Sequence, residues 1–230
     1  MNNIVSLDTS TEACSVALKC GTETQFRYCV EQRAHARVLL PMLGELMADA
    51  GLGPTQLDGV TFTRGPGAFT GVRIATAAAQ AIALGADLPV APVSTLATIA
   101  KRAHREYSLD KIAVAIDARM AEVYWGAYQI QDELPTLVGA EKVCPPNQAD
   151  QLDGSWSGVG TGWQTYPTEL AGVTGTEANK TAEPFPHALD VLAIGYPVLQ
   201  QGNGVAAEHA LPVYLRDNVA KTEAERQGRQ

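Results

Sequence analysis

The first apolar run of the chain is Ile4-Val-Ser-Leu-Asp8-Thr-Ser-Thr11, which ends in an aspartate followed by a polar turn. Further apolar runs at residues 14–18 and 26–30 predict three short strands in a meander. A second apolar run, at residues 111–117, also ends in an aspartate and is again followed by a strand-like alternation. Two such halves predict a duplicated α/β fold with a hinge near residues 107–110.

The composition is that of an acidic globular protein. The chain has 230 residues, 46% of them hydrophobic and 18% charged, which suffices for one large domain or two small ones. The formal net charge is -8. Because phosphate backbones are bound chiefly by Lys and Arg, we expect another protein to hold any nucleic acid. We find no secretory signal and no run of ~18 apolar residues, so we expect a cytoplasmic protein that does not enter a membrane.

The four cysteines are Cys14, Cys20, Cys29 and Cys144. They form no Cys-x-x-Cys pair and have no histidine at metal-ligand spacing, so we expect reduced thiols. A disulfide between Cys14 and Cys20 is the minor alternative.

Residues 34–50 have the period of a helix, with Leu39, Leu43 and Leu46 on one stripe. Further apolar residues widen this surface, which predicts two partners for the helix: its own sheet and something else. The alternative is a helix that is buried inside one domain. Pro41 implies a late start or a kink.

A glycine-rich segment, Gly65-Pro-Gly-Ala-Phe-Thr-Gly71, lies between a predicted strand at residues 59–63 and an alanine-rich helix at residues 72–84. Its amides could receive an anion at the helix N-terminus, or its glycines could form a tight turn. The segment is neither Gly-x-Gly-x-x-Gly nor a Walker motif. Arg73, in the first helical turn, suits a phosphate or a carboxylate of a partner.

A strand that ends in aspartate and hydroxyl residues can present them to a nucleotide phosphate and its metal ion. The candidate nucleotide-binding residues are Asp8, Thr9, Ser10, Thr11, Asp117, Gly160 and Gly162. The alternative is a strand followed by an ordinary polar turn. The four histidines include no i, i+4 pair for a metal, and no Ser or Cys has a nearby histidine to activate it.

The remaining segments are less distinctive. We expect a strand near residues 89–92, a helix at 93–104, surface loops at 134–157, a helix at 186–200 and a frayed tail at 221–230. We place the subdomain boundary so that residues 1–106 form the first subdomain and residues 107–230 the second.

Six motifs, in order over nearly the whole chain, resemble the TsaB family, also called YeaZ. The motifs are Asp8-Thr-Ser-Thr11, His35-Ala-Arg-Val-Leu-Leu-Pro-Met-Leu43, Gly65-Pro-Gly-Ala-Phe-Thr-Gly-Val-Arg-Ile74, Asp117-Ala-Arg-Met-Ala-Glu-Val-Tyr124, Gly160-Thr-Gly-Trp163 and Pro212-Val-Tyr-Leu-Arg-Asp-Asn-Val-Ala-Lys221. One departure is Ala68, where the family usually has serine. The resemblance implies an actin-like ATPase (ASKHA, duplicated RNase H-like) fold with two subdomains.

The resemblance also implies a role in attaching threonylcarbamoyl to the adenosine beside the anticodon of tRNAs that read codons beginning with A. In that family the paralogue TsaD performs the transfer, TsaB dimerises with it, and the ATPase TsaE joins them. TsaD-type proteins carry a His-x-x-x-His metal pair where this chain has Thr95 and Ile99. We therefore expect no catalytic residue and no bound metal here, and a noncatalytic assembly subunit that touches tRNA only through the complex.

We expect the two helices to form the interface with TsaD, or with a second copy of the chain in its absence. The predicted partner-interface residues are His35, Leu39, Leu40, Leu43, Leu46, Met47, Arg73, Ala75 and Ala79. No cofactor is firmly expected, although the resemblance allows ATP or ADP in the complex. The alternatives are a stand-alone ATP-hydrolysing enzyme of the kinase-like superfamily and, more remotely, a metallopeptidase.

Overall fold

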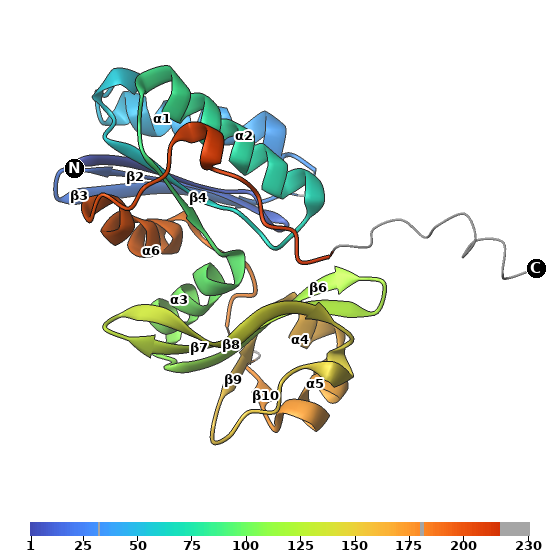
Figure 1. The fold of residues 1–230 in the computed structure, drawn as a ribbon. Coiled ribbons are helices and arrows are strands. Elements are labelled where there is room, and N and C mark those ends of the chain that lie inside the picture. Colours follow the sequence, from blue (N-terminus) through green and yellow to red (C-terminus); the bar gives the residue numbers. More distant parts are fainter. Residues whose placement is uncertain (32, 180–181, 217–230) are drawn as a thin grey trace, which may run out of the picture.

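The described residues form two five-stranded sheets, one in each lobe of the protein (Figure 1). The computed structural model describes residues 1–31, 33–179 and 182–216. The first sheet has the spatial order β3 (Glu23–Val30), β2 (Ala13–Cys20), β1 (Asn3–Asp8), β4 (Gly59–Thr63) and β5 (Val90–Val93). The second has the order β8 (Leu134–Cys144), β7 (Glu122–Gln131), β6 (Lys111–Arg119), β9 (Ser157–Val159) and β10 (Glu177–Ala178).

The two sheets repeat one topology. In the first, β1 runs antiparallel to β2 and parallel to β4. In the second, β6 runs antiparallel to β7 and parallel to β9. Short turns suffice for the antiparallel neighbours, whereas each parallel neighbour needs a longer crossover. The predicted α/β fold of two actin-like subdomains is therefore confirmed.

Helices cover both faces of the sheets, as Figure 1 shows. On the first sheet, α1 (His35–Asp49) and α2 (Phe69–Ala86) contact one face and α6 (Ala188–Gln200) the other. On the second sheet, α3 (Thr95–Tyr107) packs against one face, and α4 (Thr161–Thr165) and α5 (Pro167–Thr174) flank the other. The 3-10 turns are η1 (Pro54–Gln56), η2 (Pro146–Gln148) and η3 (Ala207–His209). Each lobe has its own apolar core.

The lobes meet where α3 contacts α6. Arg105 of α3 donates two hydrogen bonds of 2.8 Å to the buried carboxylate of Asp190 on α6. The predicted division at residue 106 places α3 in the first subdomain and α6 in the second. In the structure, α3 packs on the second sheet and α6 on the first. The chain crosses between lobes twice, and both crossings end in helices that pack on each other.

Most predicted elements are present, with shifted ends. The strand at residues 59–63 is β4 to the residue, and α1 contains Pro41 without a late start. The helix predicted at 72–84 begins three residues earlier, at Phe69. The expectation of loops throughout 134–157 is wrong, because β8 pairs with β7 over residues 134–144. The predicted frayed tail lies outside the described residues.

All four cysteines are free. Burial raises the pKa of the Cys14 thiol to about 12, so it behaves as a small apolar side chain in the first lobe. Among the described helices, α2 alone has the length and hydropathy of a membrane span. One such helix is weak evidence, because Ala75, Ala79 and Ala83 of α2 pack in the core of the first lobe.

Candidate functional site

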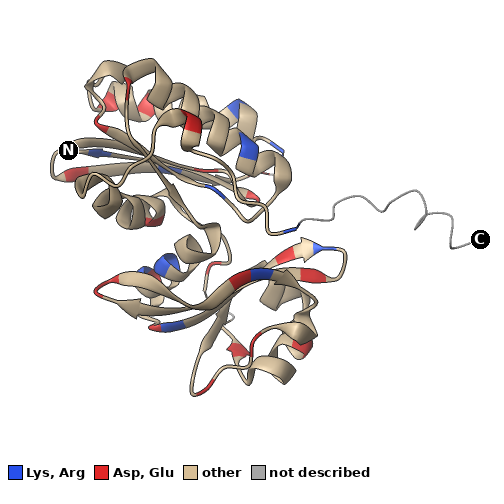
Figure 2. Ribbon diagram, in the orientation of Figure 1, with Lys and Arg blue, Asp and Glu red and all other residues tan. Residues whose placement is uncertain are grey.

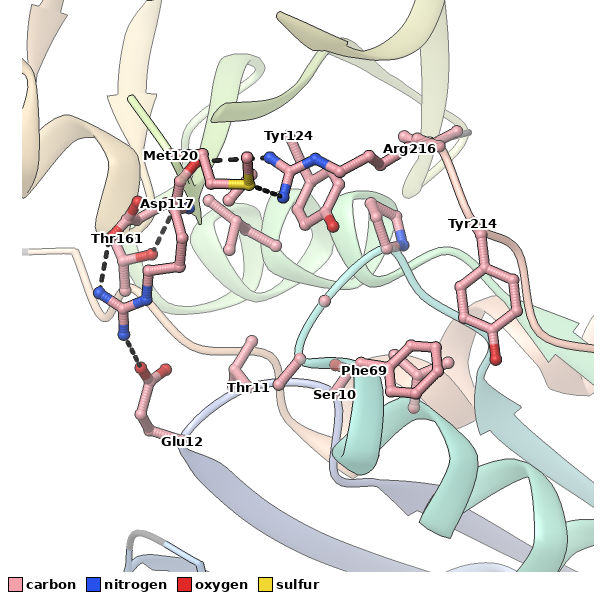
Figure 3. A pocket seen from close by; sticks show the side chains of 18 of the residues that line it. Ser10, Thr11, Glu12, Phe69, Asp117, Met120, Tyr124, Thr161, Tyr214 and Arg216 are labelled. Carbon is pink, nitrogen blue, oxygen red and sulfur yellow. Dashed lines mark hydrogen bonds and ion pairs between the residues drawn. The ribbon is translucent and has the colours of Figure 1, made fainter. Parts of the chain in front are cut away.

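A cleft of about 910 Å³ lies between the lobes, where β1 and β6 end. Residues 10–12 and 66–69 line it from the first lobe, and residues 116–120 and Thr161 from the second. Residues 213–216 of the C-terminal segment complete the lining. In Figure 3, Ser10, Thr11, Glu12 and Phe69 lie across the cleft from Met120, Tyr124 and Arg216. Of the predicted nucleotide-binding residues, the cleft thus brings together Ser10, Thr11 and Asp117, whereas Asp8, Thr9, Gly160 and Gly162 are not among its lining residues.

Asp8, however, does not face the cleft. Its side chain is fully buried. Its Oδ1 accepts hydrogen bonds from the Ser10 amide (3.1 Å), the Ser10 hydroxyl (2.7 Å) and the Thr63 hydroxyl (2.6 Å). Its Oδ2 has no partner among the described residues. Burial raises the pKa of Asp8, against the lowering effect of these hydrogen bonds. Asp8 therefore acts as an internal tie between β1, its turn and β4.

The glycine-rich segment packs directly against that turn. A side chain at Gly67 would place Cβ 2.1 Å from the Ser10 carbonyl oxygen, and one at Gly71 would place Cβ 2.0 Å from that of Thr9. The Ala68 amide donates to the Ser10 carbonyl (2.8 Å), and the Thr9 hydroxyl donates to the Gly71 carbonyl (2.7 Å). Of the two sequence interpretations, the structure favours the tight turn, because these glycines permit close backbone contact.

Asp117 does line the cleft, but its carboxylate is engaged. Arg119 donates to it twice, from its amide (2.9 Å) and from Nη1 (2.8 Å). The same guanidinium lies 3.8 Å from the carboxylate of Glu12, across the cleft. Residues 119–121 all have positive φ, a tight turn that folds Arg119 back toward Asp117. The chain's own guanidinium thus neutralises the second carboxylate.

The predicted glycines of the second lobe are packing residues. A Cβ at Gly160 would lie 2.3 Å from the Ala115 carbonyl oxygen, and one at Gly162 would lie 2.8 Å from the Ala115 side chain. They let α4 approach β6 closely. A metal-bound nucleotide needs an accessible carboxylate, and Asp8 is sealed while Asp117 is paired. These residues therefore do not fit a metal–phosphate site.

Most of the predicted partner residues lie in the core rather than on the surface. His35, Leu39, Leu43, Leu46, Met47, Ala75 and Ala79 are all buried. The apolar stripe of α1 packs on the first sheet. The residues that the prediction assigned to the partner therefore contact the protein's own sheet. His35 instead lies with Nε2 2.6 Å from the Thr11 carbonyl oxygen. Of the predicted set, only Leu40 and Arg73 are exposed.

The exposed side of these helices carries a set of small and apolar residues beside charged ones such as Glu45. This set, the outer face, is Ala36, Leu40, Gly44 and Ala48 on α1 and Ala77, Ala81 and Leu84 on α2. Leu40 is 57% exposed and Leu84 is 77% exposed. Leu84 is not among the predicted interface residues, although it continues the helical spacing Arg73, Ala77, Ala81. That spacing was the signal that could have found it.

Thr95 and Ile99 open α3, and both are fully buried. Ile99 belongs to the core of the second lobe. Ser94 caps the helix by accepting from the Leu96 and Ala97 amides. This segment is built for packing and capping. Whether the protein binds a metal stays a prediction.

Positive and negative residues are interspersed along both lobes rather than separated into one basic face (Figure 2). The net charge of -8 and this distribution over the described residues do not favour binding of a phosphate backbone by this chain.

Comparison with known proteins gives consistent matches. The family described as "TsaD: tRNA N6-adenosine threonylcarbamoyltransferase" matches residues 29–224. The tRNA threonylcarbamoyladenosine biosynthesis protein TsaB of Escherichia coli K12 is 44% identical, over 94% of this chain and 96% of that protein. TsaB of Haemophilus influenzae is 39% identical, over 94% of each chain. The solved structure of YeaZ from Pseudomonas aeruginosa is 45% identical and covers 94% of this chain and 100% of its own, with a TM-score of 0.87.

Proposed function

The chain belongs to the TsaB family of tRNA threonylcarbamoyladenosine biosynthesis proteins, and we propose that it acts there as a noncatalytic assembly subunit. In this proposal it dimerises with the catalytic paralogue TsaD and recruits TsaE in the cytoplasm. The modified adenosine lies next to the anticodon of tRNAs that read codons beginning with A. The tRNA is held by the complex, in keeping with the acidic charge of this chain.

One observation carries the noncatalytic part of the proposal. Both carboxylates at the ends of the central strands are used inside the protein, Asp8 by hydroxyl donors and Asp117 by Arg119. A catalytic nucleotide site would need at least one of them for a metal ion or a phosphate. The cleft therefore retains the shape of the actin-like fold without the free ligands for its chemistry.

The outer face of α1 and α2 supports the assembly part. Gly44, Ala77 and Ala81 keep this surface flat, while Leu40 and Leu84 project from it. Small residues let another helix approach closely, and exposed apolar anchors gain most when a partner covers them. We therefore propose that TsaD covers this face, and that a second copy of the chain covers it when TsaD is absent.

The test is co-purification with TsaD on size exclusion. Leu84→Glu and Leu40→Glu are expected to separate the two proteins, because each buries a charge in an apolar contact. Leu137→Glu is the matched control, because Leu137 is 40% exposed on β8 of the other lobe. A complex that survives both helix variants would contradict the proposed interface, and a parent chain that does not co-purify with TsaD would contradict the assembly role.

A stand-alone ATPase is the second candidate, because the cleft of about 910 Å³ is large enough for a small molecule and Asp117 lines it. Calorimetry with ATP and ADP, on the chain alone and then with TsaD, separates the two candidates. We expect no hydrolysis by the chain alone. Turnover that disappears in Asp117→Ala would favour the ATPase instead.

A further inference from the structure

An exposed arginine at the mouth of the cleft is held in place by two aromatic rings. Phe69 and Arg73 lie one helical turn apart at the start of α2. The guanidinium carbon of Arg73 lies 3.8 Å from the centroid of the Phe69 ring. Its Nε donates a hydrogen bond of 2.9 Å to the Tyr214 hydroxyl. The two rings are themselves in contact, 5.7 Å apart between centroids. We call these three residues the Arg73 clamp.

The clamp fixes one part of the guanidinium and leaves the rest unused. Three arginines line the cleft, and two of them are paired: Arg119 with Asp117, and Arg216 with Glu122 at 2.6 Å. No carboxylate pairs with Arg73 in the described part of the chain. The two terminal nitrogens of a guanidinium form a planar fork that matches a carboxylate. Arg73 therefore keeps the bidentate end of its side chain available.

Holding that fork still has a consequence for binding. A free arginine side chain loses rotamer entropy when it is immobilised in an interface. Stacking on Phe69 and the hydrogen bond to Tyr214 impose most of this order before any partner arrives. Phe69 is 54% exposed and Tyr214 is 43% exposed, so the rings also offer apolar walls around the fork. Arginine and tyrosine are the residue types that most often dominate binding energy at protein interfaces.

The position of the clamp indicates the class of ligand. Arg73 continues the exposed stripe of α2 through Ala77, Ala81 and Leu84, the face that the proposed function assigns to a protein partner. A polyanion such as tRNA would meet Glu12 and the other acidic residues of a chain with net charge -8. A single carboxylate presented by a protein avoids that repulsion.

We infer that the Arg73 clamp receives an Asp or Glu side chain of the TsaD partner, which it binds bidentately at the edge of the α2 face. The inference rests on the proposed function and adds to it a polar contact that fixes the partner's orientation at the cleft. Such a contact contributes specificity that the apolar outer face of α1 and α2 lacks.

The test measures the dissociation constant for TsaD by calorimetry. Arg73→Met keeps much of the packing on Phe69 without the charge, and it is expected to weaken binding about tenfold or more. Arg73→Lys keeps the charge but loses the fork, and a loss of at least about fivefold is expected. Tyr214→Phe should cause a smaller loss. Lys142→Ala, a cation removed from β8 of the other lobe, is the control and should not affect binding.

The outcomes separate this inference from the proposed function. If Arg73→Met and Arg73→Lys both bind within about twofold of the parent while Leu84→Glu abolishes the complex, the clamp inference is wrong and the assembly role stands. If Leu84→Glu also binds normally, the α2 face is not the interface and the clamp inference fails with it, whereas a parent chain that does not bind TsaD at all would contradict the assembly role itself. Residues 217–230 lie outside the described structure and include Asp217, Glu223 and Glu225. A chain that ends at Arg216 tests them: an Arg73→Met effect that vanishes in this shorter chain would assign the clamp to the protein's own tail and overturn the inference.

Discussion

His187 makes the stability of the protein depend on pH through a group that has no part in the proposed function. It is the N-cap of α6, where its Nδ1 accepts a hydrogen bond of 3.0 Å from the Leu189 amide. Its ring stacks on Tyr28, with centroids 5.1 Å apart, and Arg102 and Arg105 of α3 lie nearby. Burial, followed by the charges of the two arginines, lowers the pKa of His187 from 6.5 to about 3.

The sign and size of the effect follow from proton linkage. Between these two pKa values the unfolded chain holds a proton on His187 that the folded chain does not, so stability is full above about pH 6.5 and falls as the pH decreases. Lowering the pH from about 7.5 to about 5 should remove about 2 kcal/mol through this residue alone. Protonation would also remove the acceptor that caps α6 and place a cation at its positive end.

Urea unfolding of the parent and of His187→Asn at both pH values is the assay. Asparagine caps a helix well but does not titrate, so the variant is expected to lose about 2 kcal/mol less than the parent on acidification. His209→Asn, at an exposed position in η3, is the control for the replacement of a histidine by asparagine. Equal losses in the parent and in His187→Asn, within about 0.5 kcal/mol, would refute the assignment.

Three further predictions concern the turn and the helices of the first lobe. Gly71→Ala is expected to destabilise the protein by about 3 kcal/mol or more, because its Cβ would overlap a carbonyl oxygen, whereas Gly172→Ala, where Cβ meets nothing within 4 Å, should be neutral or slightly stabilising in thermal unfolding. Leu39→Ala should cost about 3 kcal/mol in urea unfolding and Leu40→Ala less than about 0.5, because the former is 1% exposed and the latter 57%; the reverse order would place the wrong stripe in the core. Burial raises the pKa of Asp8, so the free energy of unfolding decreases as the pH rises through that pKa. Asp8→Asn should therefore be at least as stable as the parent in urea unfolding near pH 8. A variant that is less stable there would show that the folded protein favours the charged form.

The strands that end at the cleft could be predicted because their signals are local. β4 is a run of five buried residues between turns, and period and composition suffice to place it. β8 could not be found in this way, because it is a largely exposed strand that contains Pro135 and Gly139. The composition of β8 disfavours a strand, and the segment is extended because its backbone pairs with β7.

The faces of the helices were harder to predict than the helices themselves. Leu39 and Leu40 are neighbours, so they point about 100° apart on a helix, and both are apolar. Periodicity therefore predicts two candidate stripes on α1 without saying which one meets the sheet. Only the packing against β2 selects Leu39 and leaves Leu40 outside. The same ambiguity led to the assignment of buried alanines of α2 to the partner surface.

The cleft shows why a phosphate-binding pattern and a packing pattern look alike in sequence. Glycine is required wherever a backbone comes close to another group, whether that group is a phosphate oxygen or a carbonyl oxygen. In this protein the neighbours of Gly67 and Gly71 are carbonyl oxygens of the chain's own β1–β2 turn, about sixty residues earlier. Likewise, a carboxylate at a strand end attracts a cation of any kind, and Asp117 has a guanidinium from its own turn.

These internal contacts connect the cleft to the outer face of α2. The glycine-rich segment that contacts the β1–β2 turn leads directly into α2, and Arg73 lies in the first turns of that helix and lines the cleft. The C-terminal segment joins the same region to the second lobe, since the Val213 amide donates to the Arg64 carbonyl and Arg216 pairs with Glu122. A partner that covers α2 and engages Arg73 would therefore press on contacts that hold both lobes. In such an arrangement the residues around the cleft would support the interface.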